Sequence, residues 1–181
     1  MYDNRIKNNS RFMATLALLT AATIAFEMLG LPQPITGPVV NMMLFLTTLL
    51  LNSTAGVLLG CITPLMALLR GQLPPPLLPM VPFIMLANAG LVLVFRIVRR
   101  SVTMRQRYKT NYILAVVLAS AIKFVILYSA VEILLPAFIG KSLPRPFVLA
   151  MSFPQLITAI TGGVLAFLIY RVIKKSSAIS T

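Results

Sequence analysis

Six runs of apolar residues, separated by short polar or proline-rich connections, take up most of this 181-residue chain. A helix needs about 20 predominantly apolar residues to cross a bilayer. The runs predict membrane spans over residues 12–29, 38–51, 55–69, 80–98, 111–135 and 147–173. We therefore expect an all-α integral membrane protein, with residues 1–181 folded as one compact bundle of six transmembrane helices. The two shortest runs, 38–51 and 55–69, are expected inside the bundle or as broken helices.

Basic residues gather in the connections that would share one side of the membrane with the two termini. Twelve of the sixteen Lys and Arg residues lie there, and three others, Arg70, Lys141 and Arg145, lie in the remaining connections. Cytoplasmic loops carry an excess of Lys and Arg, so we expect both termini in the cytoplasm of a multi-pass cell-membrane protein. The net charge of +13 is then a topology signal, and it indicates contact with the lipid bilayer rather than with nucleic acid.

A proline-rich stretch from Arg70 to Pro82 connects the third and fourth runs and holds five of the thirteen prolines. Because proline lacks a backbone N–H and clashes with the preceding turn, we expect a stiff, polyproline-like connection and no helix through it. Two interpretations remain open for this outer segment. It is either a rigid turn between two helices or a cap over a binding site formed by the outer helix ends.

Small residues recur four positions apart in the first and third runs. Ala17, Ala21 and Ala25 fall on one face of the first helix, because residues four apart lie one turn above each other. In lipid, such a stripe allows close approach of another helix, either within the bundle or from a partner protein. Gly56 and Gly60 give the third run a second close-packing signal. The sixth run is expected to be interrupted at Pro154 and again at the Gly162–Gly163 pair.

Polar side chains within the runs lie mostly toward their outer ends, and Lys123 lies midway along the fifth run. A channel would need polar lining along its whole length, so this distribution predicts a one-sided pocket that opens outward. In it, Arg70 and Lys123 would meet an anionic or carbonyl-rich part of a small solute, while Phe83 or Tyr128 would stack on a ring. The predicted substrate-binding residues are Glu27, Asn41, Arg70, Gln72, Phe83, Asn88, Lys123, Tyr128 and Gln155.

A purely structural role is the alternative interpretation of the same polar set. Lys123 and Glu27 would then form an ion pair, and the amide side chains would hydrogen-bond between helices only to hold the bundle together.

Residue types needed for most catalysis are scarce. The chain has one cysteine, Cys61, and no histidine, and its three acidic residues form no pair at hydrolytic spacing. We therefore predict no catalytic residues, no cofactor and no metal site. A phosphate-binding Gly-rich loop is also missing from the sequence, so the chain cannot drive ATP-dependent transport alone.

Several of these features together resemble the substrate-binding (S) component of energy-coupling factor (ECF) transporters. They are the basic N-terminal segment, the alanine stripe on the first helix, the run Thr36-Gly37-Pro38-Val39-Val40-Asn41, and the glycine-bearing third helix. The resemblance implies a protein of the prokaryotic plasma membrane that captures a vitamin-like or other micronutrient solute in an outward-facing pocket. It also implies that Ala17, Ala21 and Ala25 contact a transmembrane coupling subunit, and that two ATP-binding cassette ATPases power toppling of the S component.

The resemblance leaves the solute open, because the sequence carries no signature of the thiamine, riboflavin, biotin or folate binders. The alternative function is a non-transport structural or scaffold membrane protein of similar fold. In that case the polar set only joins helices, and the alanine stripe binds a different partner.

Overall fold

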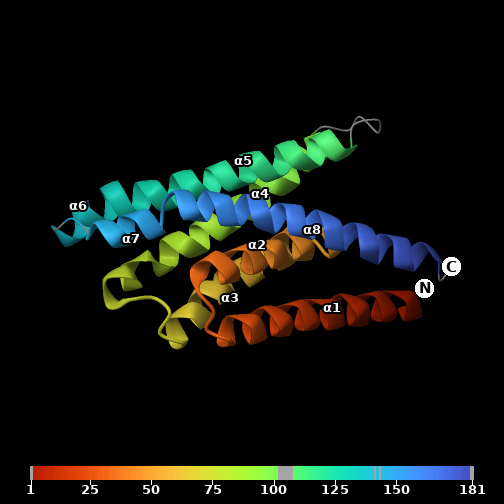
Figure 1. The fold of residues 1–181 in the computed structure, drawn as a ribbon. Coiled ribbons are helices and arrows are strands. Elements are labelled where there is room, and N and C mark those ends of the chain that lie inside the picture. The colour runs from red at the N-terminus through yellow and green to blue at the C-terminus, as the bar shows by residue number, and fades with distance from the viewer. Residues whose placement is uncertain (1, 102–107, 141, 143, 180–181) are drawn as a thin grey trace.

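Five helices that pack against one another in a ring form the body of the protein. A sixth long helix lies along the outside of this bundle (Figure 1). The computed structural model describes residues 2–101, 108–140, 142 and 144–179, which are helical apart from short connections. Around the ring, each helix packs against the next and the last packs against the first. In this order the ring consists of α2 (Gln33–Leu50), α3 (Ser53–Leu69), α4 (Val81–Ser101), α5 (Tyr108–Ser129) and α8 (Phe153–Ile179).

The sixth long helix, α1 (Tyr2–Met28), packs against α2 and α3. Gly30 follows it with a φ of +68°, the left-handed conformation that commonly ends a helix. Two buried side chains near the end of α1, Thr23 and Glu27, face the bundle. The alanine stripe lies on the opposite side, where Ala17, Ala21 and Ala25 are all exposed. The stripe is therefore not an internal packing face of this chain.

Five helical segments among the described residues are long and apolar enough to cross a membrane by length and composition. The remaining one, α3, is apolar and has 17 residues, at the lower limit of what a span needs. Large hydrophobic side chains on the outside of the bundle are exposed, as expected where lipid replaces water. The five segments are Asn9–Met28, Gln33–Leu50, Pro75–Ser101, Thr110–Phe138 and Arg145–Ser176.

The second helix begins five residues before the predicted start at Pro38. Its first turn contains Pro34, which is tolerated there because the first N–H groups of a helix have no partner within the helix. Pro38 lies further inside and does not end the helix. The Thr36 hydroxyl donates a hydrogen bond to the Leu31 carbonyl at 2.8 Å, which fixes the chain as it enters α2.

The proline-rich stretch is not polyproline-like throughout, so that prediction was wrong for its second half. Pro74 has the extended conformation, with ψ of 148°, but Pro75–Met80 forms a 3₁₀ helix, η1. The φ that proline imposes suits a 3₁₀ helix as well as polyproline, and the two differ only in ψ. Leu77 and Met80 in η1 are buried, so apolar packing selects the compact form.

The last two predicted spans have other boundaries than the sequence indicated. The fifth continues from α5 through a π-helical turn (Ala130–Leu134) into α6 (Leu135–Ile139). The sixth is divided into α7 (Arg145–Ala150) and α8, with the break at Met151–Ser152 just before Pro154. The expected interruption at Gly162–Gly163 was wrong, because both glycines lie inside α8. A Cβ on Gly162 would lie 2.7 Å from the Pro38 carbonyl oxygen, so this glycine serves close packing against α2.

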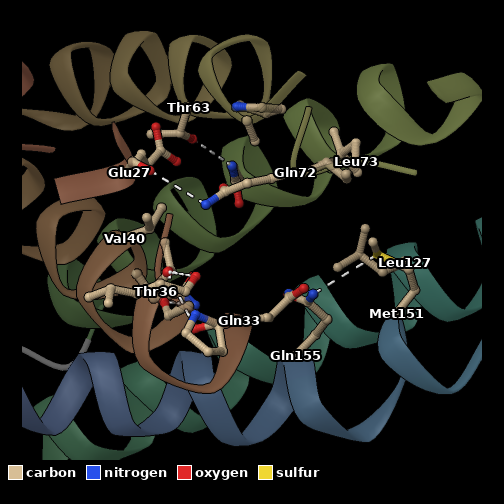
Figure 2. A pocket seen from close by; sticks show the side chains of 18 of the residues that line it. Glu27, Gln33, Thr36, Val40, Thr63, Gln72, Leu73, Leu127, Met151 and Gln155 are labelled. Carbon is tan, nitrogen blue, oxygen red and sulfur yellow. Dashed lines mark hydrogen bonds between the residues drawn. The ribbon is translucent and has the colours of Figure 1, made fainter. Parts of the chain in front are cut away.

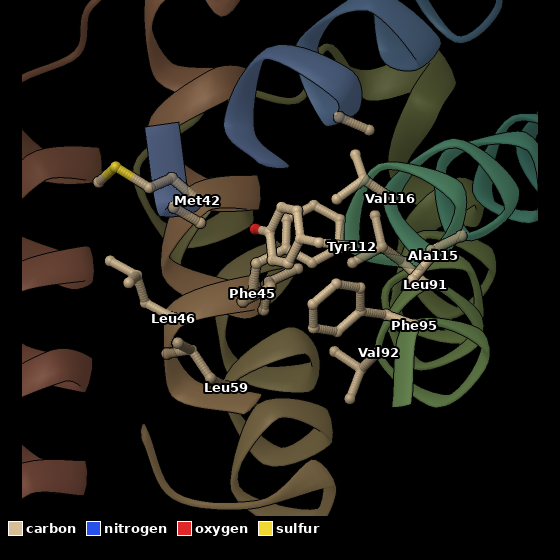
Figure 3. Packing of buried hydrophobic residues seen from close by; sticks show 14 residues of the cluster. Met42, Phe45, Leu46, Leu59, Leu91, Val92, Phe95, Tyr112, Ala115 and Val116 are labelled. Atoms are coloured by element: carbon tan, nitrogen blue, oxygen red, sulfur yellow. The ribbon is translucent and has the colours of Figure 1, made fainter. Parts of the chain in front are cut away.

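The larger hydrophobic core contains a chain of aromatic rings across the bundle (Figure 3). The ring centroids of Phe45 and Phe95 lie 4.8 Å apart, those of Phe95 and Tyr112 lie 5.5 Å apart, and those of Tyr112 and Phe167 lie 4.9 Å apart. The Tyr112 hydroxyl donates to the Gly163 carbonyl at 2.8 Å. These rings are densely packed and fill the half of the bundle nearer the termini.

Close packing of α8 on α2 gives a direct test of the fold. Gly162→Ala should lower the apparent melting temperature of the purified protein, because the new methyl group meets backbone atoms of α2 that cannot move aside. Overpacking costs about 1–3 kcal/mol, more than the roughly 1 kcal/mol that alanine gains in helix propensity. Gly90→Ala is the matched control, since its Cβ would meet side-chain methyl groups and no backbone atom: the Ile126 Cδ1 at 3.0 Å and the Ile122 Cγ2 at 3.3 Å. Equal melting temperatures for the two variants would contradict this packing.

Candidate functional site

A cavity of about 290 Å³ lies at the end of the bundle opposite the two termini (Figures 1 and 2). All six long helices and three connections contribute to its lining: residues 30–32, residues 72–73, and Met151 at the break between α7 and α8. The volume is near the lower end of the range of roughly 300–1,000 Å³ that is usual for small-molecule sites. About half of the described lining residues are polar: Glu27, Gln33, Thr36, Asn41, Thr63, Gln72, Asn88, Lys123 and Gln155.

Lys123 lies at the floor of this cavity, held between α2 and α4. Its Nζ donates to the Asn41 Oδ1 at 2.7 Å and to the Asn88 Oδ1 at 2.8 Å. The lysine is only 4% exposed, and the two asparagines are almost completely buried. Burying an ammonium group is costly unless acceptors compensate for the lost water. These two bonds provide that compensation and join α5 to α2 and α4.

Backbone carbonyls fix the orientation of both amides. The Asn41 Nδ2 donates to the Gly37 carbonyl at 2.9 Å, and the Asn88 Nδ2 donates to the Gly60 carbonyl at 2.9 Å. With each NH₂ group directed at a carbonyl, each amide oxygen is left to accept from Lys123. The lysine therefore occupies a site whose two acceptors are already oriented by neighbouring turns.

Glycines allow the helices to approach closely at this level. A Cβ on Gly60 would lie 2.9 Å from the Asn88 Cβ, and one on Gly162 would lie 2.7 Å from the Asn41 Cβ. The predicted close-packing role of the Gly56 and Gly60 pair is confirmed, since Gly56 in turn lies against Thr48 and Val92. Gly56 and Gly60 thus allow α3 to lie close to α4, the helix that carries Asn88.

Glu27 lies in the same cavity and is not paired with Lys123. It is 4% exposed, and its Oε2 is buried without a hydrogen-bond partner among the described residues. Its backbone carbonyl accepts from the Gln72 Nε2 at 3.4 Å. The predicted Lys123–Glu27 ion pair was wrong, because the ammonium group is held by two asparagines instead. The interhelical amide hydrogen bonds of that interpretation are confirmed.

Two connections, between α1 and α2 and between α3 and η1, meet beside the cavity. Besides the bond from Gln72 to α1, the exposed Arg70 places its guanidinium group against Gly30, in the space that a Cβ there would occupy. Gln155, at the start of α8, lines the cavity from the opposite side (Figure 2). Its Nε2 donates to the Ala150 carbonyl at 3.4 Å, across the break between α7 and α8.

Six of the nine predicted substrate-binding residues line the cavity, and the other three lie elsewhere. The six are Glu27, Asn41, Gln72, Asn88, Lys123 and Gln155. Arg70 is exposed beside the cavity, Phe83 packs on the smaller core, and Tyr128 stacks on Phe124 with centroids 5.6 Å apart.

The direction in which each side chain points from its helix explains why Phe83 and Tyr128 lie outside the cavity. Ile84 and Asn88 share the cavity face of α4, and Lys123 and Leu127 share that of α5. Phe83 and Tyr128 are each one position away, which turns them by about 100°. None of the described residues that line the cavity is aromatic.

Three polar lining residues were not predicted from the sequence: Gln33, Thr36 and Thr63. A periodicity signal for two of them was available. Gln33, Gly37 and Asn41 are spaced by four, and Thr63 lies three residues after Gly60, on the α3 face that meets Asn88. Residues at helical spacing from Asn41 on α2 and from Gly60 on α3 therefore mark the helix faces that line the cavity.

Comparison with known proteins places the chain in a family. Residues 11–174 match the model of the family described as "ECF transporter, substrate-specific component". Searches of curated proteins and of solved structures give no significant match. The chain belongs to the family of ECF transporter substrate-specific components. It is thus a multi-pass membrane transport protein and not an enzyme, and it binds substrate as one subunit of a transporter with a coupling subunit and ATPases.

The Lys123 cluster predicts strong coupling between its members. Asn88→Leu removes one of two acceptors of a buried ammonium group and should destabilise the protein by about 1–3 kcal/mol. Lys123→Met should also destabilise it, since two amide oxygens lose their donor. In the double variant the losses should fall short of the sum by at least about 1 kcal/mol, because each single change leaves the other partner unsatisfied.

Denaturant titration in detergent micelles would measure these free energies of unfolding. Lys123→Met combined with Thr161→Ala, an exposed change on the outside of α8, is the control and should be additive. Additive losses for Lys123 and Asn88 would contradict the hydrogen-bonded cluster.

Proposed function

We propose that this protein captures a small vitamin-like or other micronutrient solute in an outward-facing cavity and delivers it to a coupling subunit for ATP-driven import. The observation that carries the proposal is the polarity of the cavity, which collects nine polar side chains from all parts of the bundle at one end. Such convergence of polar groups in a lipid-embedded bundle is costly unless a function requires it.

The other half of the bundle supports a one-sided site. Directly below the floor, one turn further along α2 and α4, Phe45 and Val92 belong to the aromatic-containing core. Among the described residues, this packing lies between the cavity and the end with the termini, in the way of a solute bound on Lys123. Release inward then requires a movement of the whole subunit, which is the toppling that we propose on the coupling subunit.

Charge placement supports an orientation with both termini in the cytoplasm. Basic side chains are exposed at the end with the termini, among them Arg11, Arg100, Arg171 and Lys174, whereas Arg70 and Arg145 lie at the other end. Under the positive-inside rule the cavity then faces outward. We propose six spans on this basis, with α3 as the shortest, in a single domain of a prokaryotic plasma membrane.

The alanine stripe of α1 is proposed as the contact with the coupling subunit. It is exposed on the outside of the bundle, and small side chains allow a partner helix to approach closely. Because α1 packs on the ring from outside, a partner bound to it would leave the cavity lining in place. Two ATP-binding cassette ATPases would bind the coupling subunit and power the movement.

Solute binding gives the first test. A fractionated metabolite extract should raise the melting temperature of the purified protein, because a ligand that binds only the folded state stabilises it. The same fraction should have little effect on Lys123→Met, which lacks the floor cation. Tyr128→Leu is the control and should keep the full response, since Tyr128 lies outside the cavity. An equal response of wild type and Lys123→Met would contradict the site.

Partner binding gives the second test. Ala21→Leu should abolish co-purification with a co-expressed coupling subunit, because the larger side chain keeps the partner helix at a distance. The variant should remain folded, since Ala21 is exposed. The same change at Ala137, an exposed alanine on α6, serves as the control. If Ala21→Leu forms the complex as well as wild type does, the stripe is not the contact.

A further inference from the structure

The cavity contains one acidic and one basic side chain, which the protein keeps apart. Lys123 and Glu27 both line it, but the ammonium group is bonded to Asn41 and Asn88 and the carboxylate has an unpartnered Oε2. We propose, resting on the proposed function, that the solute is a compact, non-aromatic zwitterion with a carboxylate for Lys123 and a protonated amine for Glu27.

The Lys123 side of the cavity offers one donor. Of the three N–H groups of the ammonium, two are bonded to the asparagine oxygens, and the described residues supply no third acceptor. Because both asparagine side chains are themselves fixed by backbone carbonyls, the ammonium group cannot swing across the cavity without breaking its two short bonds. A solute carboxylate would take the remaining donor in a charge-assisted hydrogen bond.

The Glu27 side of the cavity offers an acceptor. Its Oε2 is buried, and none of the described residues donates a hydrogen bond to it, which is a costly state for a carboxyl group. Figure 2 shows Glu27 and Thr63 on one side of the cavity, with Gln33 and Gln155 on the other. A protonated amine of the solute would supply the missing donor and a matching charge.

The two charges together exclude simpler solutes. An inorganic cation or a simple amine would satisfy Glu27 but would be repelled by Lys123. A simple carboxylate would satisfy Lys123 but would be repelled by Glu27. A molecule with both charges matches both residues and adds no net charge to the buried site, which the low dielectric of a membrane bundle favours.

The remaining lining residues limit the shape and size of the solute's carbon skeleton. The apolar side chains among them are aliphatic, proline or methionine, such as Val40, Leu73, Ile84 and Leu127. The described lining has no aromatic ring on which a flat heterocycle would stack. With a cavity volume of about 290 Å³, a short aliphatic skeleton fits better than a fused ring system.

The experiment compares matched probes by calorimetric titration of the purified full-length protein. The probes are aliphatic amino acids of increasing chain length, with the amine at either the α or the ω position. Each is paired with the carboxylic acid that lacks the amine and with the amine that lacks the carboxylate. The best zwitterion should bind at least about tenfold tighter than both of its matched partners, since each partner loses one charge-assisted bond.

Two variants that each replace an ionisable side chain with a neutral one test which residue binds the amine of the solute and which binds its carboxylate. Glu27→Gln should weaken binding of the best zwitterion by about tenfold and leave the affinity for its matched acid unchanged or improved. Lys123→Met should weaken the zwitterion similarly and leave the matched amine unchanged or improved. A merely structural role of either residue would lower the affinity for every probe alike.

The outcomes separate this inference from the function on which it rests. If a metabolite extract stabilises the protein but the tightest probe is a simple acid, a simple amine or an aromatic amino acid, the zwitterion is excluded and the capture function stands. The same holds if the extract stabilises the protein and no probe binds. If neither the extract nor any probe binds, both proposals fail.

Discussion

The buried ammonium group of Lys123 needs both of its amide acceptors, and this requirement constrains the arrangement of the whole bundle. Asn41 comes from α2, Asn88 from α4 and Lys123 from α5, so three helices must meet at one level. Gly60 and Gly162 make that meeting possible by letting α3 and α8 approach the two asparagines closely. Polar groups that would be expensive singly in a membrane thus become a satisfied cluster.

This cluster also divides the protein into two parts with different properties. On one side is the cavity, closed outward only by short connections such as the contact between Gln72 and α1. On the other side lie the packed rings of Phe45, Phe95 and Tyr112. This division agrees with our proposal that the subunit binds its solute from one face and depends on partner proteins for transport, as a member of its family.

From the sequence we predicted the helices and a polar end of the bundle, and six of the nine candidate binding residues line the cavity there. Apolar runs and isolated polar positions are directly visible in a sequence. It could not predict helical phase, so Phe83 and Tyr128 were placed in a cavity that their neighbours line. The sequence also could not identify the partners of Lys123. A buried ammonium group needs acceptors, and either the Glu27 carboxylate or two amide oxygens would meet that need. The proline-rich stretch was ambiguous for a related reason, since proline fixes φ and leaves ψ to tertiary packing.

Native mass spectrometry of protein purified gently from its own membranes tests most directly whether the cavity floored by Lys123 holds a solute. We predict one small molecule bound per chain in the wild-type protein and none in the Lys123→Met variant. Only lipid adducts on the wild-type protein, even after incubation with a metabolite extract, would contradict the account. The polar cluster would then serve the assembly of the helices and not the capture of a solute.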